Sequence, residues 1–266
     1  MSRSQLPRSP LVLVVAQIQF SPVEGIKEKY VSVIQDQLRI SGFPYYEIRL
    51  TQQITAAEQG LQLLHQEQLV FTNKSKQTNI VVTKNSLTVN TVNYTIFDNF
   101  LHDVGSIVKE VSTILKLTDF GTLEQVSLRY VDWICPLNDV VPEKMINEKY
   151  LGGFLNDSDG VQLRQVVLER KTSVDGVVRS ILFRPKDYNI VLAEFQSTKL
   201  DQPKFSQQKE GFLILDMEHL KRMQGKDFSH DLVQKTLKEL HHEVDSLFFE
   251  QIPTKEALAL WGKEAE

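Results

Sequence analysis

Cysteine is nearly absent from this chain, in which Cys135 is the single example among 266 residues. One cysteine can form neither an internal disulfide nor a cysteine-rich metal cluster, so the sequence predicts a protein of a reducing compartment. Long apolar runs are missing as well, because no stretch approaches the roughly 20 residues that a membrane-spanning helix needs. We therefore expect a cytoplasmic protein that has no membrane partner.

Residues 11–16 are apolar and follow Arg3 and Arg8, an order that is also found in secretory signals. The apolar stretch ends at Gln17, however, and no small-residue cleavage site follows it. A secretory signal is therefore not expected at this position.

A strong excess of either charge is also lacking, since 30 basic residues face 34 acidic ones and the formal net charge is −4. Residues 226–266 hold five of the basic and nine of the acidic residues, which leaves 25 of each sign in the first 225. This balance weakens a general case for nucleic-acid binding, because nucleic-acid-binding proteins usually carry a basic surface.

Motifs of catalysis are not found, because the chain has no glycine-rich phosphate loop, no nucleophile elbow and no His-Glu-x-x-His pattern. His241, His242, Glu243 and Asp245 look like a metal cluster. On a helix, however, only His241 and Asp245, four residues apart, share a face. We therefore expect no catalytic residue, no cofactor and no bound metal. We expect His241 to hydrogen-bond to a sheet from the edge of the last helix.

One order of elements occurs twice along the chain: a strand, an amphipathic helix, several strands and a long amphipathic helix. In the first pass, apolar alternation predicts a strand at residues 11–20. Apolar residues at three- and four-residue steps predict a helix at 23–40. The remaining elements of this pass are predicted as strands at 45–54, 61–72, 79–83 and 87–92 and a helix at 97–117.

The second pass begins with a strand at residues 124–135 and a shorter helix at 143–150. Asp175 and Gly176 predict a β-hairpin between the first two of the strands that follow. A long helix at 229–251 and a short amphipathic tail close the pass. The intervening strands are predicted at 161–174, 177–184, 190–199 and 211–220.

The repeated order predicts the α+β class with two similar halves, residues 1–120 and residues 121–266. Their antiparallel sheets would form one curved surface backed by the long helices. The order is similar to that of the TATA-box-binding-protein fold, in which each half wraps a curved sheet around its long helix. That similarity concerns topology only, and such a surface can bind nucleic acid, protein or a small molecule.

The strand at residues 124–135 is one candidate site, because Arg129, Asp132 and Trp133 offer cationic, acidic and aromatic side chains in a compact patch. A central strand between two halves can also use Arg and Asp to tie the halves together. We expect this structural role, with Arg129 paired to a carboxylate between the halves.

Basic residues on the hairpin strands of the second pass are a second candidate site. They could project from one sheet surface and contact a partner, or they could form a solvated face beside neighbouring acids. These residues are Arg164, Arg170, Lys171, Arg179, Arg184 and Lys186.

Short segments at the start, middle and end of the chain also occur in a recognisable order. They are PLVLVVAQIQF at residues 10–20, LRYV at residues 128–131, and Leu240, His241, Phe248 and Ile252 before Thr254. In this order they resemble an uncharacterised prokaryotic protein family described only as sporadically distributed. The similarity covers nearly the whole chain and departs at Pro253, where that family has Thr directly after the Ile. The family carries no established activity, and its sporadic distribution implies genes carried in mobile or antiviral-defence clusters.

These observations predict a non-enzymatic binding or adaptor protein whose partner is another protein or a second copy of the chain. The resemblance implies a place in a prokaryotic antiviral-defence or mobile-element system. One alternative is a nucleic-acid-binding protein that uses the curved sheet face. A second alternative is a small-ligand-binding protein or an enzyme.

Overall fold

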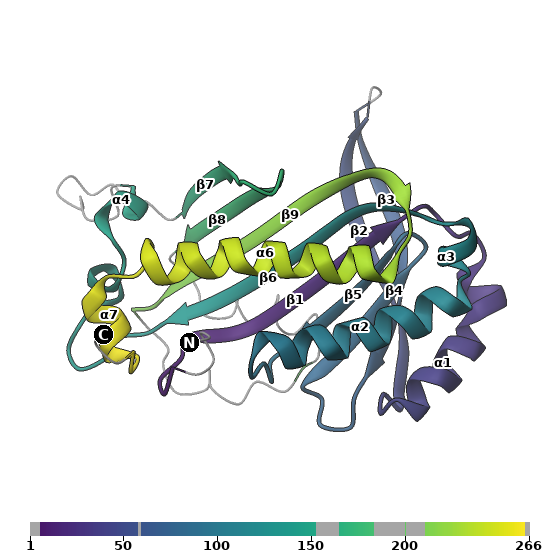
Figure 1. Ribbon diagram of the computed structural model, residues 1–266, viewed down its shortest axis with the longest axis horizontal. Coiled ribbons are helices and arrows are strands. Elements are labelled where there is room, and N and C mark those ends of the chain that lie inside the picture. Colours follow the sequence, from purple (N-terminus) through teal and green to yellow (C-terminus); the bar gives the residue numbers. More distant parts are fainter. Residues whose placement is uncertain (1–5, 58–59, 153–164, 184–199, 201–210, 264–266) are drawn as a thin grey trace.

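The computed structural model describes residues 6–57, 60–152, 165–183, 200 and 211–263. Its strands form a nine-stranded sheet in the order β2-β3-β4-β5-β1-β6-β9-β8-β7, and every neighbouring pair is antiparallel. The long helices α2 and α6 lie on the same side of this sheet (Figure 1). The fold is therefore mixed α+β, as the sequence predicts, with one continuous sheet in place of two adjacent ones.

The elements of the first 120 residues follow the predicted order, with differences at helix boundaries. The predicted helix 23–40 is divided into a short π-helix and α1, and Gly25 precedes it in a left-handed conformation with φ 72°. Lys116, with φ 55°, ends α2 and starts a separate turn. The elements are β1 (Leu11–Phe20), the π-helix (Ile26–Tyr30), α1 (Val31–Ile40), β2 (Tyr45–Ala57), β3 (Gly60–Thr72), β4 (Thr78–Thr83), β5 (Ser86–Thr91), α2 (Phe97–Ile114) and α3 (Leu117–Phe120).

The second half differs more from its prediction. The helix predicted at 143–150 consists of two separate short turns, because Ile146 between them forms a β-bridge with Pro253. The strand predicted at 190–199 lies outside the described residues. The elements are β6 (Thr122–Ile134), a 3₁₀ turn (Pro142–Met145), α4 (Glu148–Leu151), β7 (Gln165–Lys171), β8 (Val177–Phe183), β9 (Leu213–Asp227), α6 (His230–Glu250) and α7 (Lys255–Leu260).

Strand β9 continues to Asp227, seven residues beyond the predicted end at residue 220. Polar residues dominate after Leu220, so the local pattern does not extend the strand to Asp227. The backbone of β6 extends the ladder, because Thr122 at the start of β6 is paired with Asp227.

The predicted hairpin is present between β7 and β8, but its loop spans residues 172–176 rather than two residues. The Thr172 amide donates to the Gly176 carbonyl at 2.9 Å, which closes this loop. Asp175 adopts φ 59°, the left-handed conformation that Asp tolerates in turns. A Cβ on Gly176 would lie 2.6 Å from Nε2 of His219, so the close approach of this strand requires glycine.

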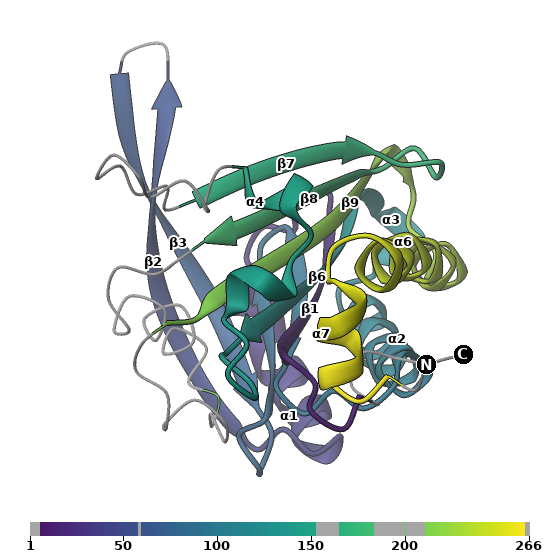
Figure 2. The same cartoon turned by 90° about the vertical axis from the view of Figure 1, so that its left-hand side faces the viewer.

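Strands β1 and β6 lie next to each other at the centre of the sheet and join the two halves. Outside them lie β5 and β9, the last strands of the two antiparallel meanders. Figure 2 shows the resulting twisted sheet from its edge, with α2 and α6 on one side.

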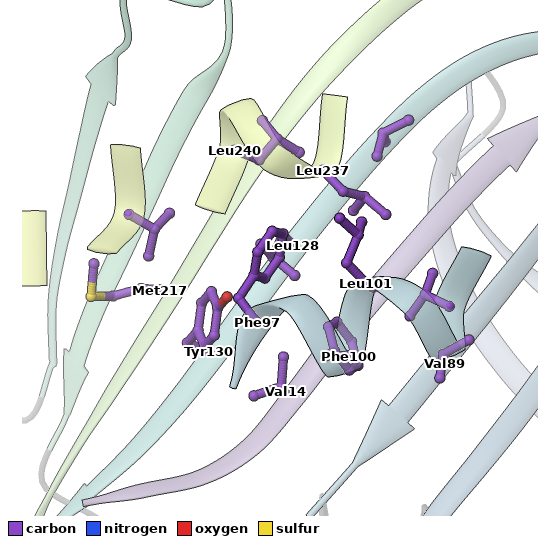
Figure 3. Close-up of a cluster of buried hydrophobic side chains, with 14 of the residues drawn as sticks. Val14, Val89, Phe97, Phe100, Leu101, Leu128, Tyr130, Met217, Leu237 and Leu240 are labelled. Carbon is purple, nitrogen blue, oxygen red and sulfur yellow. The ribbon is translucent and has the colours of Figure 1, made fainter. Parts of the chain in front are cut away.

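The main core lies between this sheet and the helices. Its residues come from alternate positions of the strands, such as Val14, Ala16 and Ile18 on β1, and from the apolar stripes of α2 and α6. Figure 3 shows that Phe97 and Leu101 of α2 and Leu240 of α6 meet side chains of β1 and β6. One core therefore includes residues of both halves.

Candidate functional site

The sheet face turned away from α2 and α6 is called the open face, because none of the described helices of eight residues or more packs on it. Strand alternation places on this face the residues that alternate with those of the main core along each strand. At its centre is a hollow of about 270 Å³ between strands β1, β6, β9 and β8. Its lining residues are Val15, Gln17, Ser127, Arg129, Arg179, Ile181, Asp216 and Glu218.

An ion pair between Arg129 and Asp216 forms one wall of the hollow. Nε of Arg129 donates to Oδ1 of Asp216 at 2.7 Å, and Nη2 donates to Oδ2 at 2.6 Å. The two side chains are only 28% and 12% exposed, so the pair is weakly screened by solvent. Such a two-point contact fixes the plane of the guanidinium group.

A second arginine and a second carboxylate complete the charges of the hollow. Glu218 follows Asp216 on the same face of β9, and Arg179 lies opposite Glu218 on β8. Arg179 also donates to Glu169 of β7 at 2.9 Å. The hollow itself thus holds two arginines and two carboxylates, and its formal charge is balanced.

Amide side chains extend the open face from the hollow toward β4. Nε2 of Gln19 donates to Oε1 of Gln17 at 3.0 Å, and Nε2 of Gln17 donates to the Thr88 hydroxyl at 3.2 Å. Further along, Nδ2 of Asn90 donates to Oδ1 of Asn79 at 2.7 Å. Hydrogen bonds between these side chains already hold them in place. Binding of a ligand to them therefore loses less side-chain conformational entropy.

The open face is apolar at the other end of β1. Leu13, Val131 and Ile214 pack there with Leu200 and Phe212. The Phe212 ring also stacks on Trp133, with ring centroids 4.5 Å apart. The neighbouring Cys135 is half-buried, and burial raises the pKa of its thiol to about 11. At neutral pH this cysteine is therefore a protonated, weakly nucleophilic thiol.

The structure separates the basic residues that the sequence grouped together. Lys171 and Arg179 lie on the open face, whereas Arg170 lies on the helix side of the sheet, opposite the buried Val178. The reason is the two-residue period of a strand, which turns neighbouring side chains to opposite faces. The remaining members of the group, Arg164, Arg184 and Lys186, lie outside the described residues.

Arg129 does pair with a carboxylate, but its partner Asp216 belongs to β9 of the same half rather than to the first half. The neighbouring strand of the first half, β1, presents Val15 to Arg129, and no carboxylate. Asp132 is fully buried and occupies the helix side of β6, across from Leu215.

His241 connects α6 to the sheet and to the other long helix. Its Nδ1 lies 2.8 Å from the hydroxyl oxygen of Tyr130 on β6, with which it shares a hydrogen bond. Its ring stacks on Phe97, the first residue of α2, with centroids 3.8 Å apart. His241 thus contacts residues of both halves of the chain.

Sequence reasoning missed His219, a fully buried residue on the helix side of β9. Its Nδ1 lies 3.0 Å from the Leu240 carbonyl, which can only accept, so Nδ1 carries the proton and donates. Nε2 then accepts from the Thr172 hydroxyl at 3.0 Å. Burial lowers the pKa of this imidazole from its ordinary value of 6.5.

The acidic residues of the hollow were also missed, although the sequence contains a signal for them. In the segment LILDMEHL of β9, Asp216 and Glu218 are two residues apart within an otherwise apolar strand. Acids at that spacing share one face, and they would be costly on a buried strand without cationic partners. Arg129, in the middle of another strand, is such a partner.

A second cavity of about 400 Å³ lies on the helix side, between the end of α1, α2 and strands β4 and β5. Its lining is rich in hydroxyl and amide groups. They include Ser41, Asn73, Thr78, Thr91, Asn93, Thr95, Asn99 and Ser106. His102, Asp103 and Glu110 also line the cavity.

Within the described ranges, no group of three or more His, Cys, Asp or Glu residues could hold a metal ion. None of the helices in this part of the chain is both long and apolar enough to cross a membrane. Comparison of the sequence with models of known protein families and with curated proteins found no match.

Proposed function

We propose that this chain is a non-enzymatic binding or adaptor protein that holds a partner protein on the open face of its sheet. The observation that carries this proposal is the charge balance of the hollow, where Arg129 and Arg179 face Asp216 and Glu218. A surface that tracks a phosphate backbone carries an excess of positive charge, which this hollow lacks. Paired charges beside ordered amides and an apolar end match the composition of a protein interface.

Substitution of Arg179 tests the proposal, because this side chain is exposed and its pairing with Glu169 contributes little to stability. We expect the tagged protein, purified from its native host, to bring down a protein partner. Arg179→Glu should abolish that capture. The matched control is Lys109→Glu, the same change of charge at an exposed position on α2.

Two results would contradict this proposal. Equal loss of the partner in Arg179→Glu and Lys109→Glu would show that the open face is not the binding surface. Recovery of nucleic acid in place of protein, with binding that weakens steeply as salt rises, would favour the nucleic-acid alternative.

We further propose that the two halves of the chain are related by duplication, with the topology of the TATA-box-binding-protein fold. The strand order supports this, since each half starts with a central strand, β1 or β6, and returns beside it with β5 or β9. A long helix, α2 or α6, follows each returning strand. The resemblance to a sporadically distributed prokaryotic family makes an antiviral-defence or mobile-element system the setting that we propose for the adaptor.

A second candidate function is the binding of a small polar ligand in the cavity beside α1 and α2. Its volume of about 400 Å³ lies within the range of small-molecule sites. Its hydroxyl and amide side chains and the carboxylates of Asp103 and Glu110 favour a ligand with several hydroxyl groups, which can donate to these acceptors. NMR titration with a panel of sugars and polyols tests this candidate. Shifts confined to residues such as Thr91 and Asn99 are expected, and no shift with any member would reject it.

A further inference from the structure

The two edges of the sheet differ in how they are protected against pairing with other strands. The edge strand β7 ends in three consecutive exposed charges, Glu169, Arg170 and Lys171. The opposite edge strand, β2, has 13 residues, of which only Glu47 and Arg49 are charged and none is proline. Among the described strands, β2 pairs with β3 alone. Natural sheets commonly block an exposed edge with charges or proline. The long edge strand β2 has few such residues, so its outer side is suited to pairing with a further strand.

Large apolar side chains are exposed along the first part of β2. Ile48 is 44% and Leu50 is 69% exposed, and both lie on the helix side of the sheet. Tyr46, on the same side, stacks on the buried Phe71. Tyr45, on the open face, is 51% exposed. Three exposed large apolar side chains thus lie on β2, whereas β7 carries two, Val167 and Leu168. A cluster of exposed apolar groups on an edge strand marks an interaction surface.

The charges on β2 are arranged symmetrically about Ile48, with Glu47 before it and Arg49 after it. If two copies of β2 run antiparallel with Ile48 on the twofold axis, Glu47 lies opposite the partner's Arg49, and Arg49 lies opposite the partner's Glu47. Ile48 then faces its own copy, and Leu50 faces the partner's Tyr46. Each pair is of a kind that stabilises neighbouring antiparallel strands.

We propose that β2 is a self-association edge, through which two copies of this chain join their sheets antiparallel about Ile48. The backbone N–H and C=O groups on the outer side of β2 would be paired by the second copy. Arg49 is held by a hydrogen bond from its Nε to Oε1 of Glu47 and is only 16% exposed, so its side chain is already ordered. Because of the twofold axis, the Glu47–Arg49 pair and the Tyr46–Leu50 pair each occur twice in the dimer, and the Ile48 pair on the axis occurs once.

Charge reversal on β2 provides the sharpest test. In a dimer of Glu47→Lys chains, or of Arg49→Glu chains, like charges would face each other twice across the axis. Each variant alone should therefore be monomeric in sedimentation velocity, whereas the wild-type chain is a dimer. A mixture of the two variants restores opposite charges at both pairs, so we expect a heterodimer to form.

The intrachain contact between Glu47 and Arg49 is broken in both variants and stays broken in the mixture. Recovery of the dimer therefore reports only the contact between copies. Circular dichroism and thermal unfolding of each variant verify that it is folded. Leu50→Lys, at the most exposed of these positions, keeps both charges and should lower the association constant by at least about tenfold.

Val167→Lys is the matched control, because Val167 is 50% exposed on the opposite edge strand. We expect its association constant to equal that of the wild type. A monomeric wild-type chain over the whole accessible concentration range would overturn the proposal. So would a Leu50→Lys chain that associates as tightly as the wild type, or a mixture of the charge-reversed chains that stays monomeric. A wild-type chain that stays monomeric but binds an added strand-forming peptide of unrelated sequence would assign the edge to another protein's strand instead.

Discussion

Several polar groups buried in this protein are held by contacts between distant parts of the chain. Arg129 meets Asp216 across 87 residues, His219 meets Thr172 and Leu240, and His241 meets Tyr130. Each contact offsets part of the cost of removing a polar group from water. Removal of one partner would leave the other buried without a hydrogen bond. Such a substitution should therefore lower the free energy of unfolding by more than the net contribution of the hydrogen bond.

We predict that Arg129→Ala lowers the free energy of unfolding by about 1–3 kcal/mol, because Asp216 loses a charged partner while it stays largely buried. Urea unfolding measures this change. The control is Arg179→Ala, whose ion pair is 46% and 54% exposed and should contribute less than about 1 kcal/mol. Equal losses in the two variants would show that burial of the Arg129 pair has no energetic consequence.

A second residue-scale prediction concerns pH and His219. Burial holds the pKa of this imidazole below its ordinary value of 6.5. As the pH falls, His219 is therefore protonated at a higher pH in the unfolded chain than in the folded chain. The contribution of His219 to the free energy of unfolding is therefore fully present above pH 6.5, and it decreases as the pH falls below that value. His219→Gln removes this titration. The stability difference between wild type and variant, largest near neutral pH, should shrink as the solution is acidified.

NMR titration of the histidine side chains gives the direct measurement for this prediction. Protonation of His219 must break the acceptor role of Nε2 toward Thr172, so its titration midpoint should lie below the ordinary histidine value of 6.5. A midpoint for His219 at or above 6.5 would contradict the assignment.

At the scale of elements, two glycines illustrate how packing decides the effect of one substitution. Gly105 lies inside α2, where a Cβ would meet only the flexible amide of Gln234 on α6, at 2.5 Å. Gly176 lies in the β7–β8 loop, where a Cβ would meet both the ring of the buried His219 and the backbone oxygen of Leu220.

We therefore predict opposite outcomes for the two alanine variants. Gly105→Ala should raise the free energy of unfolding by up to about 1 kcal/mol, because alanine favours the helix and Gln234 can turn aside. Gly176→Ala should lower the stability, because a backbone atom cannot turn aside. Thermal unfolding of both variants is the measurement. A destabilised Gly105→Ala would mean that Gln234 has no alternative position.

At the scale of the whole molecule, the junction of β1 and β6 determines how the chain unfolds. The two strands share one ladder, and the main core contains residues of both halves, such as Ile34 in the first and Leu240 in the second. Neither half has a separate core to retain when the other unfolds. We therefore predict that the protein unfolds in one cooperative transition.

The two tryptophans, Trp133 and Trp261, both lie in the second half, so their fluorescence reports that half alone. Ile34 is fully buried in the first half, and Ile34→Ala should cost about 2–5 kcal/mol. Cooperative unfolding requires the fluorescence midpoint to shift as much as the circular-dichroism midpoint. A fluorescence transition that stays at the wild-type midpoint would show that the halves unfold independently.

Most elements of the first half could be predicted from the sequence because their patterns are local. The strand β1 has the predicted bounds, and the apolar stripes of α2 and α6 follow the helical period over many turns. Errors occur where contacts with distant residues decide the local structure. The bridge between Ile146 and Pro253 and the extension of β9 along β6 are two such cases.

The sequence by itself determined the class of the fold, the order of most of its elements and the alternating faces of strands such as β1 and β6, because these depend on the repeat of apolar residues within short segments. Only the tertiary structure decided that the strands form one sheet and that Arg129 meets Asp216 rather than a carboxylate of the first half. The physical reason is that strand neighbours and register are set by packing between segments far apart in the chain, which no local pattern specifies.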